Sequence, residues 1–301
     1  WFRLDGFYRT GHYHWVDEGD FFGVYQETYY GPNIDIYDAV APIGFEFAGR
    51  RALDGLKIAA GPQMFWGANP GFIVKYSRSI GGLDITLLHQ EDVSQQGSAT
   101  SSRVIPEQMT RRSTLHLKQS AGALTLDLGG IFAGSNKIGQ SYQAVRELDG
   151  QSYLNSGYSL LNDEIDIMDT LGAKAKLTLK AGAVQFFAQG AYQGLVADGG
   201  GAAAVNLTRW QLLPSGRGNQ VHGTGGGLVQ IGTVQIAAQG LFQKPLEGPL
   251  PLIEDRIDSS SGVYFPGTSA RNVVDDPFAV LENRETLAGE ILLSYDPTPI
   301  T

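Results

Sequence analysis

Basic side chains recur at alternate positions in stretches where every second residue is apolar. They are Arg50, Lys57, Lys75, Lys118, Lys174, Lys176, Lys180 and Arg284. A period of two places such residues on one face of a β-strand. The same faces carry fewer acids, which are Glu46, Asp84, Asp127 and Glu290. Lysine and arginine gathered on one surface attract anions, so the pattern predicts a path for anionic solutes.

Three other groups of residues have the chemistry of metal ligands. His12 and His14 would share one strand face, but no third ligand accompanies them, and we expect them to be histidines of a rim or lumen. The acidic runs at 162–169 and 254–258 lack the spacing and the glycine of a calcium loop. We expect solvated acidic loops there, with bridging of lipopolysaccharide phosphates by divalent cations as the alternative. The sequence therefore predicts no metal site and no cofactor.

Motifs for catalysis or nucleotide binding are weak. The glycine-rich stretch Gly223–Gly227 is followed by strand residues, whereas a phosphate-binding loop needs a helix there. The chain has no cysteine and no Gly-x-Ser-x-Gly elbow. A Ser/His/Asp group could still assemble in space, as in an outer-membrane lipase, but no local pattern indicates one. We therefore expect a protein that is not an enzyme.

The composition excludes several other classes of protein. Hydrophobic residues make up 42% of the 301 residues, charged residues 18%, and glycine, with 40 residues, exceeds its usual share of about 7%. A net charge of −9 argues against a nucleic-acid partner. The chain has no run of about 18 apolar residues, so a transmembrane helix is not expected.

Alternating segments run through most of the chain and predict about thirteen strands. They lie near 2–14, 21–30, 43–51, 56–66, 71–79, 83–91, 111–119, 123–133, 171–180, 183–196, 221–231, 234–243 and 284–295. Short turns are predicted at Asp17–Asp20, Leu53–Gly55, Gly81–Gly82, Ala121–Gly122, Ala181–Gly182 and Gly232. Longer polar loops alternate with them at 31–42, 67–70, 92–110, 134–170, 197–220 and 244–283. Short turns on one rim and long loops on the other are typical of outer-membrane barrels.

Aromatic residues recur about ten residues after the short turns, on the apolar face. They are Trp66, Phe132, Tyr192 and Phe242, and Phe72 begins a strand at the same height. A tilted strand needs about 9–11 residues to cross the hydrocarbon, so these residues are expected to form an interfacial girdle. The residues predicted to face lipid are Ile58, Met64, Leu126, Leu177, Phe186 and Ile236. Those predicted to face the lumen include Lys57, Lys174, Lys176 and Gln235.

These patterns predict a single all-β domain over residues 1–301, an antiparallel transmembrane β-barrel of the bacterial outer membrane. The turn at Asp17–Asp20 would make the first strand run toward the short-turn rim, and the last strand runs the same way. Single-chain barrels have an even number of strands and both ends on the periplasmic side. We therefore expect the thirteen strands to be part of a barrel of 16 or more strands, with the domain truncated at both ends.

One stretch resembles a known family. Residues 55–70, GLKIAAGPQMFWGANP, resemble a strand and the start of a loop in alginate-export-type porins, although Pro62 stands where a basic residue is expected. The resemblance implies a basic lumen that carries an anionic polysaccharide. It assigns no functional residue in this chain.

The leading hypothesis is an outer-membrane channel for anionic solutes or an anionic polysaccharide. Its expected partners are outer-membrane lipid and lipopolysaccharide, the anionic solute, and a periplasmic or other outer-membrane protein, with no nucleic acid. The alternatives are a surface-binding or structural protein acting through long extracellular loops, and an outer-membrane hydrolase. The loops at 134–170 and 244–283 discriminate between channel and surface protein, because inward folding would narrow a pore and outward folding would form a binding surface.

Overall fold

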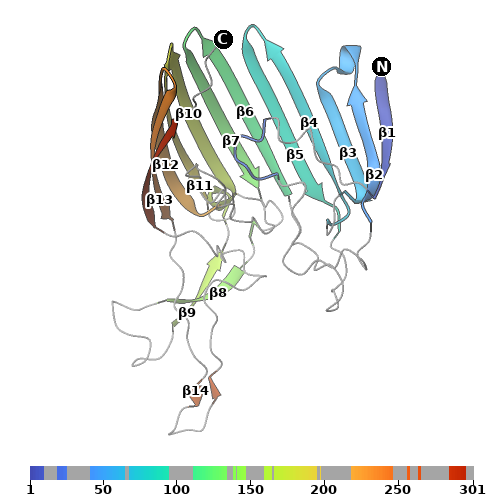
Figure 1. Cartoon of the computed structure of the whole chain (residues 1–301). Coiled ribbons are helices and arrows are strands. Elements are labelled where there is room, and N and C mark those ends of the chain that lie inside the picture. The colour runs from blue at the N-terminus through green and yellow to red at the C-terminus, as the bar shows by residue number, and fades with distance from the viewer. Residues whose placement is uncertain are drawn as a thin grey trace.

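The chain folds into one large antiparallel sheet. The computed structural model describes residues 1–9, 19–25, 41–64, 68–94, 111–133, 138–139, 141–146, 159–164, 166–194, 197, 218–246, 256–257, 264–265 and 285–295. Twelve strands pair in the order β1-β2-β3-β4-β5-β6-β7-β10-β11-β12-β13-β16, so each strand lies beside the next sheet strand in the chain (Figure 1). The predicted all-β, antiparallel architecture is confirmed. No helix in the described ranges has the length and apolar character needed to cross a membrane.

The sheet strands agree closely with the predicted segments. They are β1 (Phe2–Tyr8), β2 (Ile43–Gly49), β3 (Leu56–Gln63), β4 (Gly71–Ile80), β5 (Leu83–Asp92), β6 (Arg111–Ala121), β7 (Leu124–Ala133), β10 (Leu171–Ala181), β11 (Val184–Gln193), β12 (Gln220–Ile231), β13 (Val234–Pro245) and β16 (Thr286–Tyr295). Two small ladders lie outside the sheet, β8 (Ser141–Arg146) with β9 (Ser159–Glu164), and β14 (Arg256–Ile257) with β15 (Tyr264–Phe265). Two short 3₁₀ helices are η1 (Arg51–Leu53) and η2 (Met168–Thr170). The long loops predicted at 134–170 and 244–283 therefore contain short strands.

Tight turns and long connections occupy opposite rims of the sheet. Two-residue turns join β4 to β5, β6 to β7, β10 to β11, and β12 to β13, and all lie at the upper rim in Figure 1. Gly122, Gly182 and Gly232 open three of them with φ near +60°, the left-handed region that glycine adopts without steric cost. The predicted short turns at these positions are confirmed.

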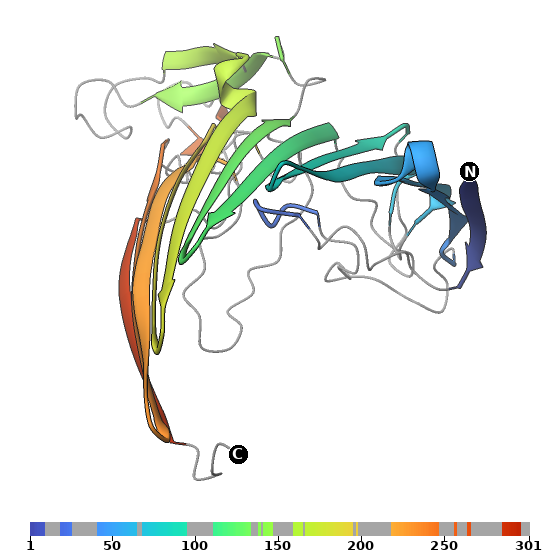
Figure 2. The ribbon, with the colours of Figure 1, turned by 90° about the horizontal axis from the view of Figure 1, so that it is seen from above.

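The two faces of the sheet differ in chemistry. The face that we call convex carries mainly leucine, isoleucine, valine, phenylalanine, alanine and glycine, and its large apolar side chains are widely exposed. The opposite, concave face carries lysine, glutamine, threonine and acidic residues (Figure 2). The register places Leu126 and Leu177 on the convex face and Lys174, Lys176 and Asp127 on the concave face. The alternation read from the sequence is thus confirmed.

Met64 departs from this alternation. It was predicted on the lipid-facing side, but its side chain is 1% exposed and packs into the buried core. The cause is a register shift between β2 and β3, at Ile43 and Phe45, close to the end of β3 at Gln63. Such a shift breaks the period of two, so positions beyond it cannot be assigned to a face by counting.

The strand predicted at 21–30 is wrong for residues 21–25, which form turns, and 26–30 lie outside the described residues. Gly19 and Asp20 do not form the rim turn that was predicted at Asp17–Asp20, because residues 19–25 fold onto the concave face (Figure 2). No described residue between β1 and β2 belongs to a strand, so the sheet has twelve strands where thirteen were predicted.

This correction reverses the direction assigned to the first strand. The Trp1 carbonyl accepts a hydrogen bond from the Arg50 amide at 2.8 Å, and Tyr295 pairs with Val234. Arg50 precedes the short connection from β2 to β3, and Val234 follows the tight turn between β12 and β13, so both contacts lie at the short-turn rim. The predicted direction of the first strand is therefore wrong, and a barrel of 16 or more strands stays a prediction.

The sheet curves strongly but keeps two edges. In the described part of the chain, β1 pairs only with β2 and β16 only with β13, and the two edges lie well apart in Figure 2. The buried core lies on the concave side rather than between two sheets. It consists of Phe22, Val24, Tyr25, Ala59, Met64, Ala68, Ile73, Leu88, Ile131, Ala133 and Ala197.

Glycine permits close strand packing in β12. A Cβ on Gly226 would lie 2.6 Å from the Ala238 carbonyl oxygen, and one on Gly227 would lie 2.8 Å from the Phe186 ring. Gly226 and Gly227 therefore serve packing within the sheet, as is usual for glycine inside strands.

Candidate functional site on the concave face

Residues 19–25, which we call the inward segment, lie against the middle of the concave face. The Tyr25 hydroxyl donates to the Leu88 carbonyl oxygen at 3.1 Å, and the Thr114 hydroxyl donates to the Tyr25 oxygen at 3.1 Å. The Arg112 guanidinium lies 5.2 Å from the centre of the Tyr25 ring. Burial raises the pKa of the Tyr25 hydroxyl above its ordinary value, so it stays protonated and keeps its role as a donor.

Asp20 folds the inward segment back on itself. Its carboxylate accepts hydrogen bonds from the backbone N–H groups of Gly23, Val24 and Tyr25 at 3.0, 3.1 and 2.9 Å. Burial raises the pKa of this carboxyl, and the three N–H groups and the charge of Arg112 oppose that rise. An aspartate that organises the backbone ahead of it in this way favours a turn over a strand.

Lys174 and His116 hold the aromatic part of the inward segment. The Lys174 ammonium donates to the Phe21 carbonyl oxygen at 2.6 Å and lies 4.7 Å from the centre of the Phe21 ring. The same ring stacks on His116, with 4.5 Å between ring centres. The His116 Nε2 lies 2.8 Å from a carboxylate oxygen of Asp127. Strands β6, β7 and β10 thus supply the seat for residues far away in the sequence.

A basic strip crosses the concave face between this seat and the short-turn rim. We define it as Lys118 on β6 and Lys174, Lys176 and Lys180 on β10. In the register, Asp127 on β7 stands between Lys118 and Lys176. Lys118 and Lys180 are exposed, and Lys176 is half-buried with its ammonium 5.7 Å from the centre of the Phe187 ring. One acid among these lysines leaves a local excess of positive charge.

The other predicted path residues are spread over the sheet. Lys57 and Lys75 are register partners on β3 and β4, away from the basic strip, and Lys75 is 2% exposed. Arg50 is exposed at the short-turn rim, and Arg284 lies outside the described residues. The structure therefore brings together four of the eight predicted basic residues.

The predicted girdle aromatics fall on the convex face. Phe72, Phe132, Tyr192 and Phe242 all lie toward the ends of their strands at the long-connection rim. Tyr192 and Phe242 are each 43% exposed. Trp66 lies outside the described residues.

Four charged residues of the concave face were not predicted. Asp5 pairs with Arg3 at 2.6 Å, Asp92 accepts from the Asn69 amide at 3.1 Å, and Arg112 donates to the Gln90 side chain. Alternation within the predicted segments 2–14 and 111–119 already places Arg3, Asp5 and Arg112 on this face, and extending 83–91 by one residue would have found Asp92. Asp92 follows Leu88 and Gln90 with a period of two, for example.

The metal-ligand candidates give no cluster in the described ranges. No three histidine, aspartate or glutamate side chains gather there as ligands of one ion. Asp166 accepts hydrogen bonds from the Met168 and Asp169 amides at 2.6 and 3.2 Å, which indicates a local turn. His12, His14 and the acids at 254, 255 and 258 lie outside the described residues.

Asp20→Ala should loosen the inward segment, because the partly buried N–H groups of Val24 and Tyr25 lose their acceptor, at a cost of about 1–3 kcal/mol. We expect faster hydrogen exchange at the amides of residues 23–25 and lower stability toward urea. The control is Asp166→Ala, which removes a similar turn-forming carboxylate at an exposed position. Equal exchange at residues 23–25 in wild type and Asp20→Ala would contradict this role.

Comparison with protein-family models, curated proteins and solved structures finds no match for this chain. The resemblance of residues 55–70 to alginate-export-type porins therefore stays a prediction, and the function is argued from the two faces of the sheet.

Proposed function

We propose that this chain forms the wall of an outer-membrane β-barrel channel that favours anionic solutes, with an anionic polysaccharide as one candidate. The observation that carries the proposal is the separation of chemistry between the two faces of the same twelve strands. Leu124, Leu126 and Leu128 are each about two-fifths exposed on the convex face, and Ile291 is 80% exposed. Soluble proteins rarely expose apolar surface over such an extent, whereas a lipid-facing barrel wall requires it.

The arrangement of the connections supports the same proposal. Tight turns gather at one rim and long connections at the other, as in barrels with periplasmic turns and extracellular loops. The aromatic residues Phe72, Phe132, Tyr192 and Phe242 lie near the long-connection rim, where an interfacial girdle is expected. The proposal thus places the protein in the bacterial outer membrane, with lipid and lipopolysaccharide against the convex face.

The basic strip supports the preference for anions. Its lysines face the concave side, which would be the lumen, and low-dielectric walls focus the field of such charges. The inward segment fills part of that side, so the path would be narrow beside Lys174. Charges on the wall act most strongly on solutes in a narrow path. In a wider path, mobile ions screen the wall charges over about 8–10 Å.

The reversal potential across a planar bilayer tests the proposal. The full chain is refolded into lipid and measured under a KCl gradient, and a potential of anion-selective sign is expected. A cation-selective sign would refute the preference for anions, and a potential near zero would replace it with a wide, unselective pore. Absence of conductance from folded protein would overturn the channel itself and favour a surface protein acting through its long loops.

A further inference from the structure

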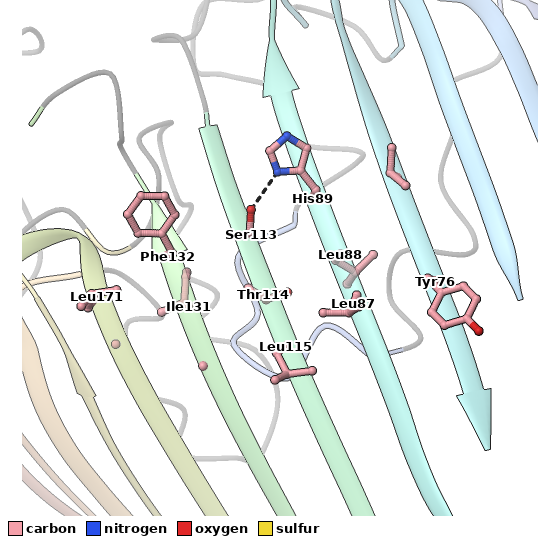
Figure 3. A pocket seen from close by; sticks show the side chains of 13 residues that line it. Tyr76, Leu87, Leu88, His89, Ser113, Thr114, Leu115, Ile131, Phe132 and Leu171 are labelled. Atoms are coloured by element: carbon pink, nitrogen blue, oxygen red, sulfur yellow. Dashed lines mark hydrogen bonds between the residues drawn. The ribbon is translucent and has the colours of Figure 1, made fainter. Parts of the chain in front are cut away.

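The convex face carries an open groove across β4, β5, β6, β7 and β10 (Figure 3). Its volume is about 620 Å³. The apolar side chains that line it include Val74, Tyr76, Leu87, Leu115, Phe132 and Leu171. Gly130 contributes no side chain between Leu115 and Ala173, its neighbours in the register. The groove is therefore a surface suited to a flexible hydrocarbon chain.

A serine and a histidine lie at one end of this groove. His89 on β5 and Ser113 on β6 are register partners, and the His89 Nδ1 lies 2.8 Å from the Ser113 Oγ (Figure 3). The His89 Nε2 lies 3.3 Å from a carboxylate oxygen of Glu91. Hydroxyl, imidazole and carboxylate thus form an unbroken chain of hydrogen bonds, the arrangement that activates a serine nucleophile.

Glu91 is fixed in turn by an ion pair with Arg111. Arg111 and Ser113 are two residues apart on the same face of β6, so a positive charge stands beside the serine. The side chains of His89 and Glu91 are 33% and 22% exposed, so the group is open to the convex side but not fully solvated.

Polar residues such as Ser113, His89, Glu91 and Arg111 are unusual on the convex face. The other polar or charged side chains that the described strands present there, tyrosines apart, are Arg78, Gln119 and Lys244, which stand singly near strand ends. Polar groups on a surface that meets lipid carry a free-energy cost, so a cluster of four that bond to one another calls for a function. An isolated network for stability would have no need of an adjoining apolar groove.

We infer that Ser113, His89 and Glu91 form a hydrolase site for esters of long-chain fatty acids. Ser113 Oγ attacks the ester carbonyl carbon, and its proton passes to His89 Nδ1. Glu91 accepts a hydrogen bond from the Nε2–H of His89 without taking the proton, and it orients the ring, so it is a positioning residue. The ester C–O bond breaks, and the alcohol leaves with the proton from His89. Water then attacks the acyl-serine, gives a proton to His89, and releases the fatty acid and the Ser113 hydroxyl.

The apolar groove and the position of the site along the strands indicate an ester of a fatty acid as the substrate. Phe132 is the register partner of Ser113, and Phe72 is that of Glu91, so the site lies at the level of the aromatic girdle. In the proposed membrane setting, this is the boundary between hydrocarbon and headgroups, where the ester carbonyls of lipids lie. That placement rests on the proposed function, whereas the Ser113–His89–Glu91 geometry does not.

Covalent labelling tests the nucleophile without any membrane. A fluorophosphonate probe added to the full chain in detergent should label Ser113, identified by mass spectrometry of the modified peptide. Ser113→Ala and His89→Ala should abolish labelling. The matched control is Ser120→Ala on the same strand, whose serine is hydrogen-bonded to Thr125 at 3.0 Å. Labelling that survives Ser113→Ala, or that never exceeds the background on Ser120, would overturn the site.

Hydrolysis tests the substrate class. Wild type should cleave a p-nitrophenyl ester of a medium-chain acid, and Ser113→Ala should lower the rate on the order of 10⁴-fold. Glu91→Gln should lower kcat, calculated per folded molecule, while KM is unchanged, and an unfolded fraction alone would leave that kcat at the wild-type value. Mixed micelles of phospholipid or of lipopolysaccharide distinguish the two lipid sources of the ester. Absence of hydrolysis of all three substrates by wild-type protein would refute the inferred activity.

Two controls separate this inference from the channel. Circular dichroism and the heat-dependent mobility of the folded protein show whether each variant is folded. Conductance of Ser113→Ala should equal that of wild type, because the site lies on the face opposite the basic strip. Hydrolysis without conductance would support the hydrolase site and overturn the channel. Conductance without hydrolysis would support the channel and overturn the hydrolase site.

Discussion

Ala238→Arg should lower the free energy of unfolding in a lipid bilayer by about 2–4 kcal/mol, while Gln239→Arg should change it little. The two residues are neighbours in the middle of β13 and lie at the same depth, but they point to opposite faces. Ala238 is exposed on the convex face, and an arginine there would have to enter hydrocarbon. Gln239 faces the concave side and donates to Glu290 at 3.1 Å, so an arginine there gains a carboxylate partner.

Urea titration of the protein refolded into vesicles measures both effects. The difference between the two variants shows whether the convex face meets lipid or water. If it met water, Ala238→Arg would change the free energy of unfolding by only about 0.5 kcal/mol. Equal stabilities for the two variants would mean that the convex face does not meet lipid. A larger loss for Gln239→Arg would mean that the faces are assigned the wrong way round.

The second large effect concerns ion selectivity. Changing Lys176 and Lys180 together to Glu should reverse the sign of the reversal potential under a KCl gradient. The change of four charges would leave Lys118 and Lys174 beside three carboxylates, Asp127 and the two new ones, so the strip would become acidic. Focused wall charge changes local ion concentration on the order of tenfold or more. Lys174 stays unchanged, because it also holds the Phe21 carbonyl oxygen and its loss would disturb the inward segment.

The matched control changes Arg78 and Lys244 to Glu, which alters the net charge by the same amount on the convex face. This control should keep the wild-type sign. If both double variants shift the potential equally, the effect comes from net charge at the mouth rather than from the strip. If neither shifts it, the lysines of β10 do not line the path.

The sequence predicted the sheet well because its strands have two different faces. Alternation places every sheet strand, and the glycines with positive φ mark the tight turns. The inward segment escaped prediction because Phe21, Phe22, Val24 and Tyr25 have the composition of a strand. What decides their structure is the Asp20 carboxylate and contacts with strands more than sixty residues away.

The two candidate sites differ in how far sequence could reveal them. Lysines spaced by two on β10 form part of the basic strip by themselves, so counting along the chain finds them. Ser113 and His89 are 24 residues apart and meet only through the register of β5 with β6. Register depends on the pairing of whole strands, and no local motif records it.

The two edges of the sheet have a kinetic consequence. Each tight hairpin can form from its own turn within microseconds, because its two strands are close in the sequence. Among the described strands, the outer edges of β1 and β16 pair with no further strand, and they are separated by almost the whole sequence. In hydrocarbon each unpaired group costs several kcal/mol, so strands cannot enter one by one. If the sheet enters a membrane as proposed, insertion should therefore be all-or-none and slow, because both edges must find partners before the strands are stable in hydrocarbon.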